Sequence, residues 1–225
     1  MPRKTKTVKI TDIKSEKAWL KNTGDTTYKE KHLNKKKTIL IICEGQTEEL
    51  YFKSFPVVSC TVTSISIGQS KESLINYAIE YNKKEKFDEI WCVYDMDTNQ
   101  IGKETSSFDN SITKAESNKI KVAYSNDSFE LWFCLHFHLI DSKNKRDFYS
   151  KKIGEYLGVN YIKNGKKHEF CKNIYSLINE LGCQKKAILN AKKLHKLVID
   201  YPPSKQNPVT LVYKLVELLN KNMRK

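Results

Sequence analysis

Three acidic residues follow directly on two apolar runs of the sequence. Glu44 comes after the run Thr38–Cys43, and Asp95 and Asp97 come after the run Ile90–Tyr94. If both runs are neighbouring strands of a parallel sheet, their carboxyl ends meet at one edge, and the three carboxylates converge there. Such carboxylates repel one another unless protons or a metal ion neutralise them, and an all-oxygen ligand set favours Mg²⁺ or Mn²⁺. The pattern therefore indicates metal-dependent chemistry on a phosphodiester.

The elements that would position these carboxylates form an alternating pattern. Between residues 38 and 137 the sequence changes four times from a strand-like to a helix-like pattern, which predicts a parallel sheet with helices on both faces. The predicted strands are 38–43, 60–67, 90–94 and 120–124, and the predicted helices are 47–55, 70–82, about 98–118 and 129–137, with Thr47, Ser70 and Asn126 as helix caps. We expect an α/β fold whose sheet has about four strands.

Beyond Asp141 the pattern is only helical. The predicted helices there are about 146–157, 168–181, 184–199 and 209–222. These changes of pattern divide the chain into three parts: a basic N-terminal arm (residues 1–37), a catalytic α/β domain (residues 38–141) and a basic helical C-terminal region (residues 142–225) packed on that domain.

The charge is distributed unevenly over these parts. The chain has 40 Lys and Arg against 26 Asp and Glu, a net charge of +14, which favours a nucleic acid partner. Residues 1–37 sum to +8 and residues 143–225 to +13, whereas residues 38–142 sum to −7. An acidic centre can approach phosphate if a cation lies between them. Only three of the basic residues are arginines, so we do not expect sequence-specific reading of guanine edges in the major groove.

A lysine stripe in the predicted helix 184–199 is a candidate phosphate-binding surface. Helical spacing places a group of lysines opposite a group of apolar residues. The lysines are Lys185, Lys186, Lys192, Lys193 and Lys196, and the apolar residues are Ile188, Leu189, Leu194 and Leu197. The alternative is an ordinary solvated helix face, but the basic excess of this region favours contact with phosphate.

Several other classes of protein do not fit. No apolar run reaches the roughly 18 residues of a membrane-spanning helix, so we expect no membrane partner. The N-terminus, MPRKTKTVKITDIK, lacks the apolar core of a secretory signal. The six cysteines form no CxxC pair, which argues against a zinc ribbon or a dithiol redox site and favours reduced thiols in a cytoplasmic protein.

Four motifs resemble a known family. They are Cys43–Phe52 (CEGQTEELYF), Asp95–Asp97 (DMD), Ser125–Phe137 (SNDSFELWFCLHF) and Asn207–Thr210 (NPVT). In this order and spacing, over most of residues 38–215, they are similar to the RloB-like (AbiLii-like) family of small Toprim-domain proteins. They also resemble the Toprim domain of topoisomerases, primases and OLD-type nucleases. Asp127 stands where the pattern of the RloB-like family prefers Pro.

The resemblance implies a Toprim (Rossmann-like) catalytic domain and a Mg²⁺-dependent endonuclease. It implies that Asp95 and Asp97 bind Mg²⁺ and that Glu44 is a metal ligand or an acid/base at the phosphate. Glu48, one helical turn after Glu44, is a candidate ligand of a second metal ion, or else a partner of the helix dipole. Gly45 would permit a tight turn directly after Glu44.

The motif after the fourth predicted strand adds further candidates by resemblance. Ser125 and Asn126 are candidates to hold a phosphate or a water molecule in the same crevice, or else they cap the helix. Glu130 is a candidate additional ligand or an ion-pair partner. The family also implies an AAA-type ATPase as partner and a role in anti-phage or restriction-linked defence.

Two other functions stay open from the sequence. A non-catalytic partner of an AAA-type ATPase would bind nucleic acid through its basic ends without using the carboxylates. A phosphatase similar to the haloacid dehalogenases would use Asp95 as nucleophile and Asp97 as acid/base, because Asp95–Thr98 fits DxDxT, although two predicted strands precede this motif. For the nuclease, the sequence does not choose between RNA, including tRNA, and DNA.

Overall fold

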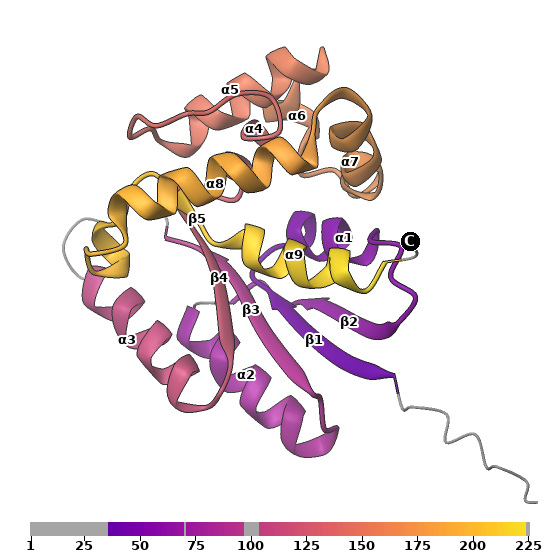
Figure 1. Ribbon diagram of the computed structural model, residues 1–225, viewed down its shortest axis with the longest axis vertical. Coiled ribbons are helices and arrows are strands. Elements are labelled where there is room, and N and C mark those ends of the chain that lie inside the picture. The colour runs from indigo at the N-terminus through magenta and orange to yellow at the C-terminus, as the bar shows by residue number, and fades with distance from the viewer. Residues whose placement is uncertain (1–35, 70, 97–103, 224–225) are drawn as a thin grey trace, which may run out of the picture. The chain divides into compact units, whose positions relative to one another are not determined.

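A five-stranded sheet forms the centre of the structure, a computed structural model that describes residues 36–69, 71–96 and 104–223 (Figure 1). The strand order is β2-β1-β3-β4-β5. The strands are β1 (Lys37–Cys43), β2 (Cys60–Ser66), β3 (Glu89–Asp95), β4 (Lys121–Asn126) and β5 (Val209–Thr210). The first four are parallel, and β5 is antiparallel to β4. The α/β fold expected from the sequence is confirmed.

The apolar sequences of β1 and β3 explain why these two strands lie in the buried centre of the sheet. All residues of Ile39–Cys43 in β1 and of Ile90–Asp95 in β3 are buried. Continuous burial of this kind is required where helices cover both faces of a parallel sheet. Cys43 lies opposite Val93 in the register of the two strands, so β1 and β3 end at the same edge.

Helices cover both faces of the sheet (Figure 1). The first helix, α1 (Gln46–Lys53), lies on one face with α9 (Val212–Lys221), whereas α2 (Lys71–Lys84) and α3 (Glu104–Ser117) lie on the other. The direction of the crossovers explains this division. The connection through α1 runs outward from β1 to β2, and those through α2 and α3 run in the opposite direction across the sheet. Right-handed crossovers therefore place α1 opposite α2 and α3.

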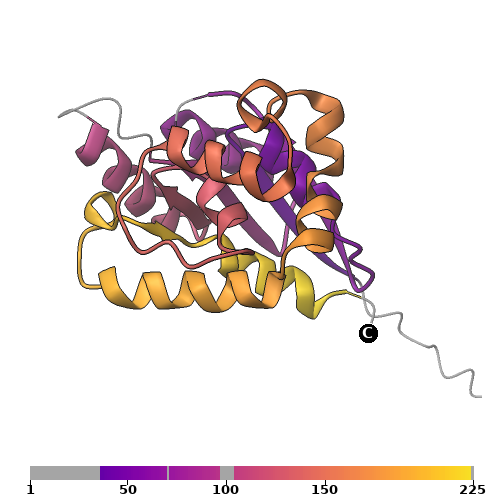
Figure 2. The same cartoon turned by 90° about the horizontal axis from the view of Figure 1, so that it is seen from above.

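A group of helices lies beyond the carboxyl ends of the strands (Figures 1 and 2). It consists of α4 (Glu130–Cys134), α5 (Arg146–Leu157), α6 (Tyr161–Asn164), α7 (His168–Leu181) and α8 (Gln184–Val198). In this group α4 packs against α5 and α8, and α7 packs against α1. The bounds of α5 and α7 are those predicted from the sequence, whereas α6 and the short 3₁₀ turn Pro203–Lys205 were not predicted.

The structure differs from the predicted elements in several details. The predicted helix 209–222 begins only at Val212, because Val209 and Thr210 pair with β4 as β5. The predicted helix 129–137 is shorter, and its N-cap is Phe129, since Asn126 ends β4. Thr47 does not cap α1 either: its Oγ1 lies 3.4 Å from the Sγ atom of Cys171.

Parts of the sequence predictions lie outside the described residues, namely residues 1–35 of the basic arm, Ser70, Asp97, residues 98–103 of the predicted helix 98–118, and residues 224–225 of the C-terminal region. All six cysteines are within the described residues, and none forms a disulfide. Across the ranges that the structure describes, each helix is too short or too polar to cross a membrane.

Candidate functional site

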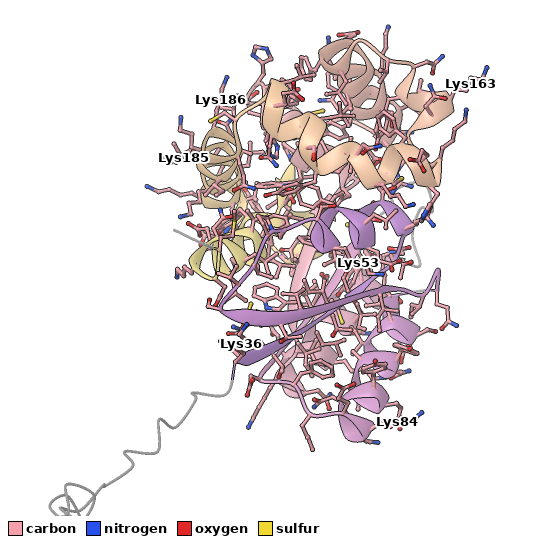
Figure 3. All side chains as sticks on the ribbon, turned by 90° about the vertical axis from the view of Figure 1, so that its right-hand side faces the viewer. Lys36, Lys53, Lys84, Lys163, Lys185 and Lys186 are labelled. Atoms are coloured by element: carbon pink, nitrogen blue, oxygen red, sulfur yellow. The ribbon has the colours of Figure 1, made fainter. Side chains whose placement is uncertain are left out.

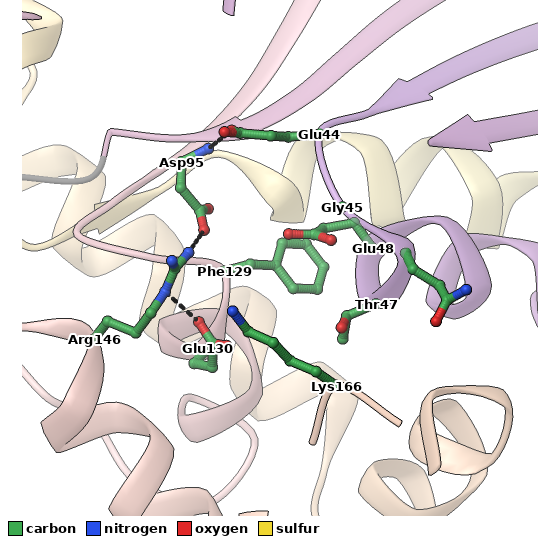
Figure 4. Close-up of a pocket in the computed structure, with 10 residues that line it drawn as sticks. Glu44, Gly45, Thr47, Glu48, Asp95, Phe129, Glu130, Arg146 and Lys166 are labelled. Atoms are coloured by element: carbon green, nitrogen blue, oxygen red, sulfur yellow. Dashed lines mark hydrogen bonds and ion pairs between the residues drawn. The ribbon is translucent and has the colours of Figure 1, made fainter. Parts of the chain in front are cut away.

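A cleft of about 350 Å³ opens at the carboxyl edge of the sheet, between the ends of β1 and β3 and the helices beyond them (Figure 4). We call it the acidic cleft. Its lining residues are Glu44, Gly45, Gln46, Thr47, Glu48, Asp95, Phe129, Glu130, Arg146 and Lys166. Segments far apart in the sequence therefore meet at the position where a sheet of this type usually binds its ligand.

Glu44 connects the ends of the two central strands. Its backbone N–H donates to the carbonyl of Val93 at 2.9 Å, and its side-chain Oε2 accepts a hydrogen bond from the backbone N–H of Asp95 at 3.2 Å. Its own carbonyl accepts a hydrogen bond from Gly68, just after β2, at 3.0 Å. The Glu44 carboxylate is thereby held beside Asp95 at the edge of the cleft (Figure 4).

Glu48 enters the cleft from the first turn of α1, and only 8% of it is exposed. Gly45 provides the room for this side chain, because a Cβ atom at position 45 would lie 2.6 Å from Oε2 of Glu48. The backbone of Gly45 is extended (φ −119°, ψ 165°), a conformation open to any residue. The glycine is therefore explained by space and not by the tight turn predicted from the sequence.

Arg146, at the start of α5, joins two of the carboxylates. Its Nη2 lies 2.5 Å from Oδ2 of Asp95, and its Nε lies 3.5 Å from Oε2 of Glu130. Its backbone N–H also donates to Oδ2 of Asp127 at 2.8 Å. Side chain and backbone together fix the first turn of α5 against the ends of β3 and β4. Lys166 extends toward the same space from the loop between α6 and α7 (Figure 4).

Negative charge outweighs positive charge in the acidic cleft. Burial, together with the carboxylates of Glu130 and Glu44, raises the pKa of Glu48 to about 7. Burial and the carboxylates of Glu48 and Glu130 raise the pKa of Asp95 well above its usual range, although the guanidinium of Arg146 opposes this. Carboxylates in such surroundings are stabilised in their charged form by any additional cation.

Phe129 lines the cleft and belongs to an aromatic cluster that fixes α1 against α4. The ring of Phe129 lies 5.8 Å from that of Tyr51 and 5.0 Å from that of Phe133, both edge to face. The hydroxyl of Tyr51 accepts a hydrogen bond from Nε1 of Trp132 at 2.9 Å. Because these large side chains are buried, the positions of Glu48 and Glu130 on the two helices are fixed relative to each other.

The donor atoms of the cleft suit a hard divalent cation. Carboxylate oxygens are the ligands that Mg²⁺ and Mn²⁺ prefer, and burial together with neighbouring carboxylates raises the pKa values of Glu48 and Asp95 despite the nearby Arg146. Within the described ranges, however, no three His, Cys, Asp or Glu side chains are already arranged to hold a metal ion, and Asp97 is not part of those ranges. A metal ion would have to compete with Arg146 for the carboxylate of Asp95.

Residues 39–219 match the model of one protein family, described as RloB-like protein. The chain belongs to the RloB-like family. This match extends from β1 into α9, so it includes every residue of the acidic cleft. It confirms the family resemblance carried by the four sequence motifs. The curated proteins and the solved structures compared with the chain contain no match.

In this RloB-like protein, the structure brings some of the predicted site residues together and places others elsewhere. Glu44, Gly45, Glu48, Asp95 and Glu130 line the acidic cleft. Ser125 and Asn126 are buried at the end of β4 and do not line it. The Oγ of Ser125 lies 2.9 Å from Oγ1 of Thr210, and the Nδ2 of Asn126 donates to the carbonyl of Gln206 at 2.7 Å. Both side chains thus hold the C-terminal segment against β4.

The predicted lysine stripe on α8 also lies away from the cleft lining. Nζ of Lys192 pairs with Oε1 of Glu217 at 2.6 Å, and Lys193 is exposed. Leu189 and Leu197, which were expected on the buried side, are 60% and 69% exposed beside the lysines. Of the predicted apolar group only Leu194 is buried, and the other buried residues of α8 are Ala187, Asn190 and Ala191. Lys185 extends outward from this helix (Figure 3), whereas Nζ of Lys186 donates to the carbonyl of Phe137.

The two cations of the cleft, Arg146 and Lys166, were not predicted from the sequence. Both belong to segments that were assigned only as helix or connection, and Arg146 is 51 positions from Asp95. A weak signal did exist, since Arg146 is one of only three arginines in a chain otherwise rich in lysine. Arginine is favoured over lysine where a buried carboxylate or a phosphate is bound in fixed geometry.

Proposed function

We propose that this RloB-like protein is a Mg²⁺- or Mn²⁺-dependent, Toprim-type endonuclease that hydrolyses phosphodiester bonds of nucleic acid. The observation that carries the proposal is the meeting of Glu44, Glu48 and Asp95 in one largely buried cleft beside Arg146 and Lys166. Carboxylates would bind the metal ion, and the cations would bind a phosphate. A cleft of this composition suits a polyanionic substrate that requires a metal ion.

The side chains of the cleft divide these tasks. Glu44, Glu48 and Asp95 would hold the metal ion, with Glu130 and Asp97 as further candidate ligands. Once bound, the ion would polarise the phosphate and supply a nucleophilic hydroxide at neutral pH. Arg146 presents a planar guanidinium that can bind two phosphate oxygens, which lysine cannot do in the same fixed geometry.

The wider setting of this activity is also proposed. The net charge of +14 supports RNA, including tRNA, or DNA as substrate. Six cysteines without a disulfide support a reducing compartment such as the cytoplasm. Membership of the RloB-like family supports a role in anti-phage or restriction-linked defence, with an AAA-type ATPase as partner.

The test is cleavage of mixed cellular RNA and of mixed DNA by the purified protein in Mg²⁺, in Mn²⁺ and in EDTA. We expect cleavage of one polymer with metal and none in EDTA. Glu44→Gln and Glu48→Gln should abolish cleavage. Glu49→Gln is the matched control, because Glu49 neighbours Glu48 on α1 but bonds to Lys53 and Ser66 outside the cleft. Cleavage that survives EDTA or Glu44→Gln would contradict the proposal.

The two alternative functions give different results in the same experiment. A non-catalytic binding protein would bind nucleic acid in EDTA and with Asp95→Asn, and it would cleave neither polymer in any metal. The ion pair between Asp95 and Arg146 is the observation that favours this alternative, because it occupies a proposed ligand. A phosphatase of the haloacid dehalogenase type would form an aspartyl-phosphate at Asp95 and retain activity with Glu44→Gln.

A further inference from the structure

A second cavity, of about 560 Å³, lies at the other side of the end of β4. Its lining residues are Asn126, Lys143, Val198, Tyr201, Ser204, Lys205 and Asn207. We call it the Tyr201 cavity. It shares no lining residue with the acidic cleft, and the proposed cleavage chemistry does not use it.

A network of hydrogen bonds holds the wall of the Tyr201 cavity in place. Gln206, which is buried, accepts a bond from the hydroxyl of Tyr124 at 2.6 Å and donates to the carbonyl of Tyr201 at 2.7 Å. Ser204 donates through its N–H and its hydroxyl to the carboxylate of Asp109, at 2.9 and 2.7 Å. The segment 201–207 is therefore bound to β4 and α3 and presents a preformed surface.

The lining of this cavity has the chemistry of a nucleotide site. Lys143 and Lys205 are exposed, and no carboxylate is among the lining residues. Tyr201 is 57% exposed, so its ring can stack against a base. The amide of Asn207 donates to Oδ1 of Asn126 at 3.1 Å, whereas its own buried Oδ1 accepts no hydrogen bond from the described residues. That oxygen can accept a bond from the amino group of a base.

Adjacent residues connect the two cavities. Asn126 lines the Tyr201 cavity, and the next residue, Asp127, accepts the backbone hydrogen bond of Arg146, whose side chain lines the acidic cleft. Neighbouring residues at the end of β4 thus contribute to the two sites.

We propose that the Tyr201 cavity binds a nucleotide of a single-stranded segment of the same nucleic acid that enters the acidic cleft. Tyr201 stacks on the base, Asn207 bonds to its edge, and Lys143 and Lys205 bind the flanking phosphates. This inference rests on the proposed nuclease function. A single strand is required because a base in a duplex does not expose its face to a tyrosine ring.

The test is binding of fluorescently labelled single-stranded RNA and DNA of about ten nucleotides, measured in EDTA so that no cleavage occurs. Tyr201→Ala should weaken binding by roughly fivefold to a hundredfold, the loss expected for one stacked base, and Tyr201→Phe should restore it. Lys205→Gln should reduce the slope of the logarithm of the binding constant against the logarithm of the salt concentration by about one, because one phosphate contact is lost. The matched control is Tyr77→Ala, which removes a partly exposed tyrosine from α2.

The outcomes separate this inference from the proposed nuclease function. Equal binding by Tyr201→Ala, Tyr77→Ala and the unchanged protein would overturn it, and would leave the surface around Tyr201 for a protein partner. If Tyr201→Ala alone weakens binding while no metal supports cleavage, the nucleotide site stands and the nuclease function fails. Thermal unfolding of each variant checks that it is folded.

Discussion

The two ends of β3 hold carboxylates in opposite electrostatic surroundings. Glu89, its first residue, pairs with the amines of Lys37 and Lys121 and accepts a hydrogen bond from Nε1 of Trp91 at 3.2 Å. Although burial opposes it, these bonds lower the pKa of Glu89. At Asp95, its last residue, burial and neighbouring carboxylates raise the pKa, although the Arg146 guanidinium opposes this.

This difference separates a structural ion pair from a candidate site. At the amino end of β3 one carboxylate meets two amines, so its charge is balanced by the surrounding side chains. At the carboxyl end Asp95 and its neighbours Glu44, Glu48 and Glu130 share two cations. An excess of carboxylates over cations lowers the stability of the fold unless a further cation is bound. Carboxylates in a cleft whose pKa values are strongly shifted are therefore candidate functional residues.

The largest effect is expected from Asp95→Asn. It should reduce the proposed cleavage by about a thousandfold or more, because a neutral amide is a poor ligand for the metal ion. The melting temperature should stay the same or rise, since a buried charge among like charges is removed. Rates measured under single-turnover conditions and thermal unfolding check both parts. If Asp95→Asn kept the cleavage rate of the unchanged protein, Asp95 would have only a structural role, as Glu89 has.

Arg146→Ala should have the next largest effect. It removes the cation between Asp95 and Glu130 and should lower the free energy of unfolding by about 2 kcal/mol in EDTA, as expected for a broken and partly exposed ion pair. If the cleft binds a cation, Mg²⁺ should raise the melting temperature of this variant more than that of the unchanged protein. Denaturation with and without Mg²⁺ measures this difference. No response to Mg²⁺ in either protein would argue against the metal site.

Glu89→Gln should lower stability by about 1 kcal/mol at pH 7 and leave cleavage unchanged. The pKa of Glu89 is lower in the folded than in the unfolded chain. The stability that the Glu89 carboxylate contributes is therefore complete above its pKa in the unfolded chain, about 4.3. This stability is lost as the pH falls through its lower pKa in the folded chain. Urea denaturation at pH 7 and at acid pH should show the gap between the two proteins closing. If the difference in the free energy of unfolding did not change with pH, the charge of Glu89 would not be its cause.

Lys166→Gln should give the smallest effect. Lys166 lines the acidic cleft, and its loss should weaken binding of nucleic acid about threefold to tenfold and reduce the salt dependence by about one charge. Lys84→Gln is the control, because Lys84 lies at the exposed end of α2. Titrations at several salt concentrations provide the measurement. Equal losses for the two variants would show only a general effect of net charge.

The sequence alone determined the four parallel strands and the acidic side of the cleft. The apolar runs of β1 and β3 are local patterns, and the acids that follow them must lie together because parallel strands end at the same edge. Glu44 and Asp95 could therefore be placed before the structure was known. Glu48 followed from its position one helical turn beyond Glu44.

Only the tertiary structure decided which residues complete and surround that cleft. Arg146 reaches Asp95 because α5 returns across the ends of the strands, and no local pattern encodes such a contact. The two-residue strand β5 was hidden for the same reason, since its residues pair with β4 residues 83 and 85 positions away. Helical periodicity predicted a face on α8, but the packing of its neighbours determined that Leu189 and Leu197 stay exposed. Periodicity reports local geometry, whereas burial depends on which distant segment covers each face.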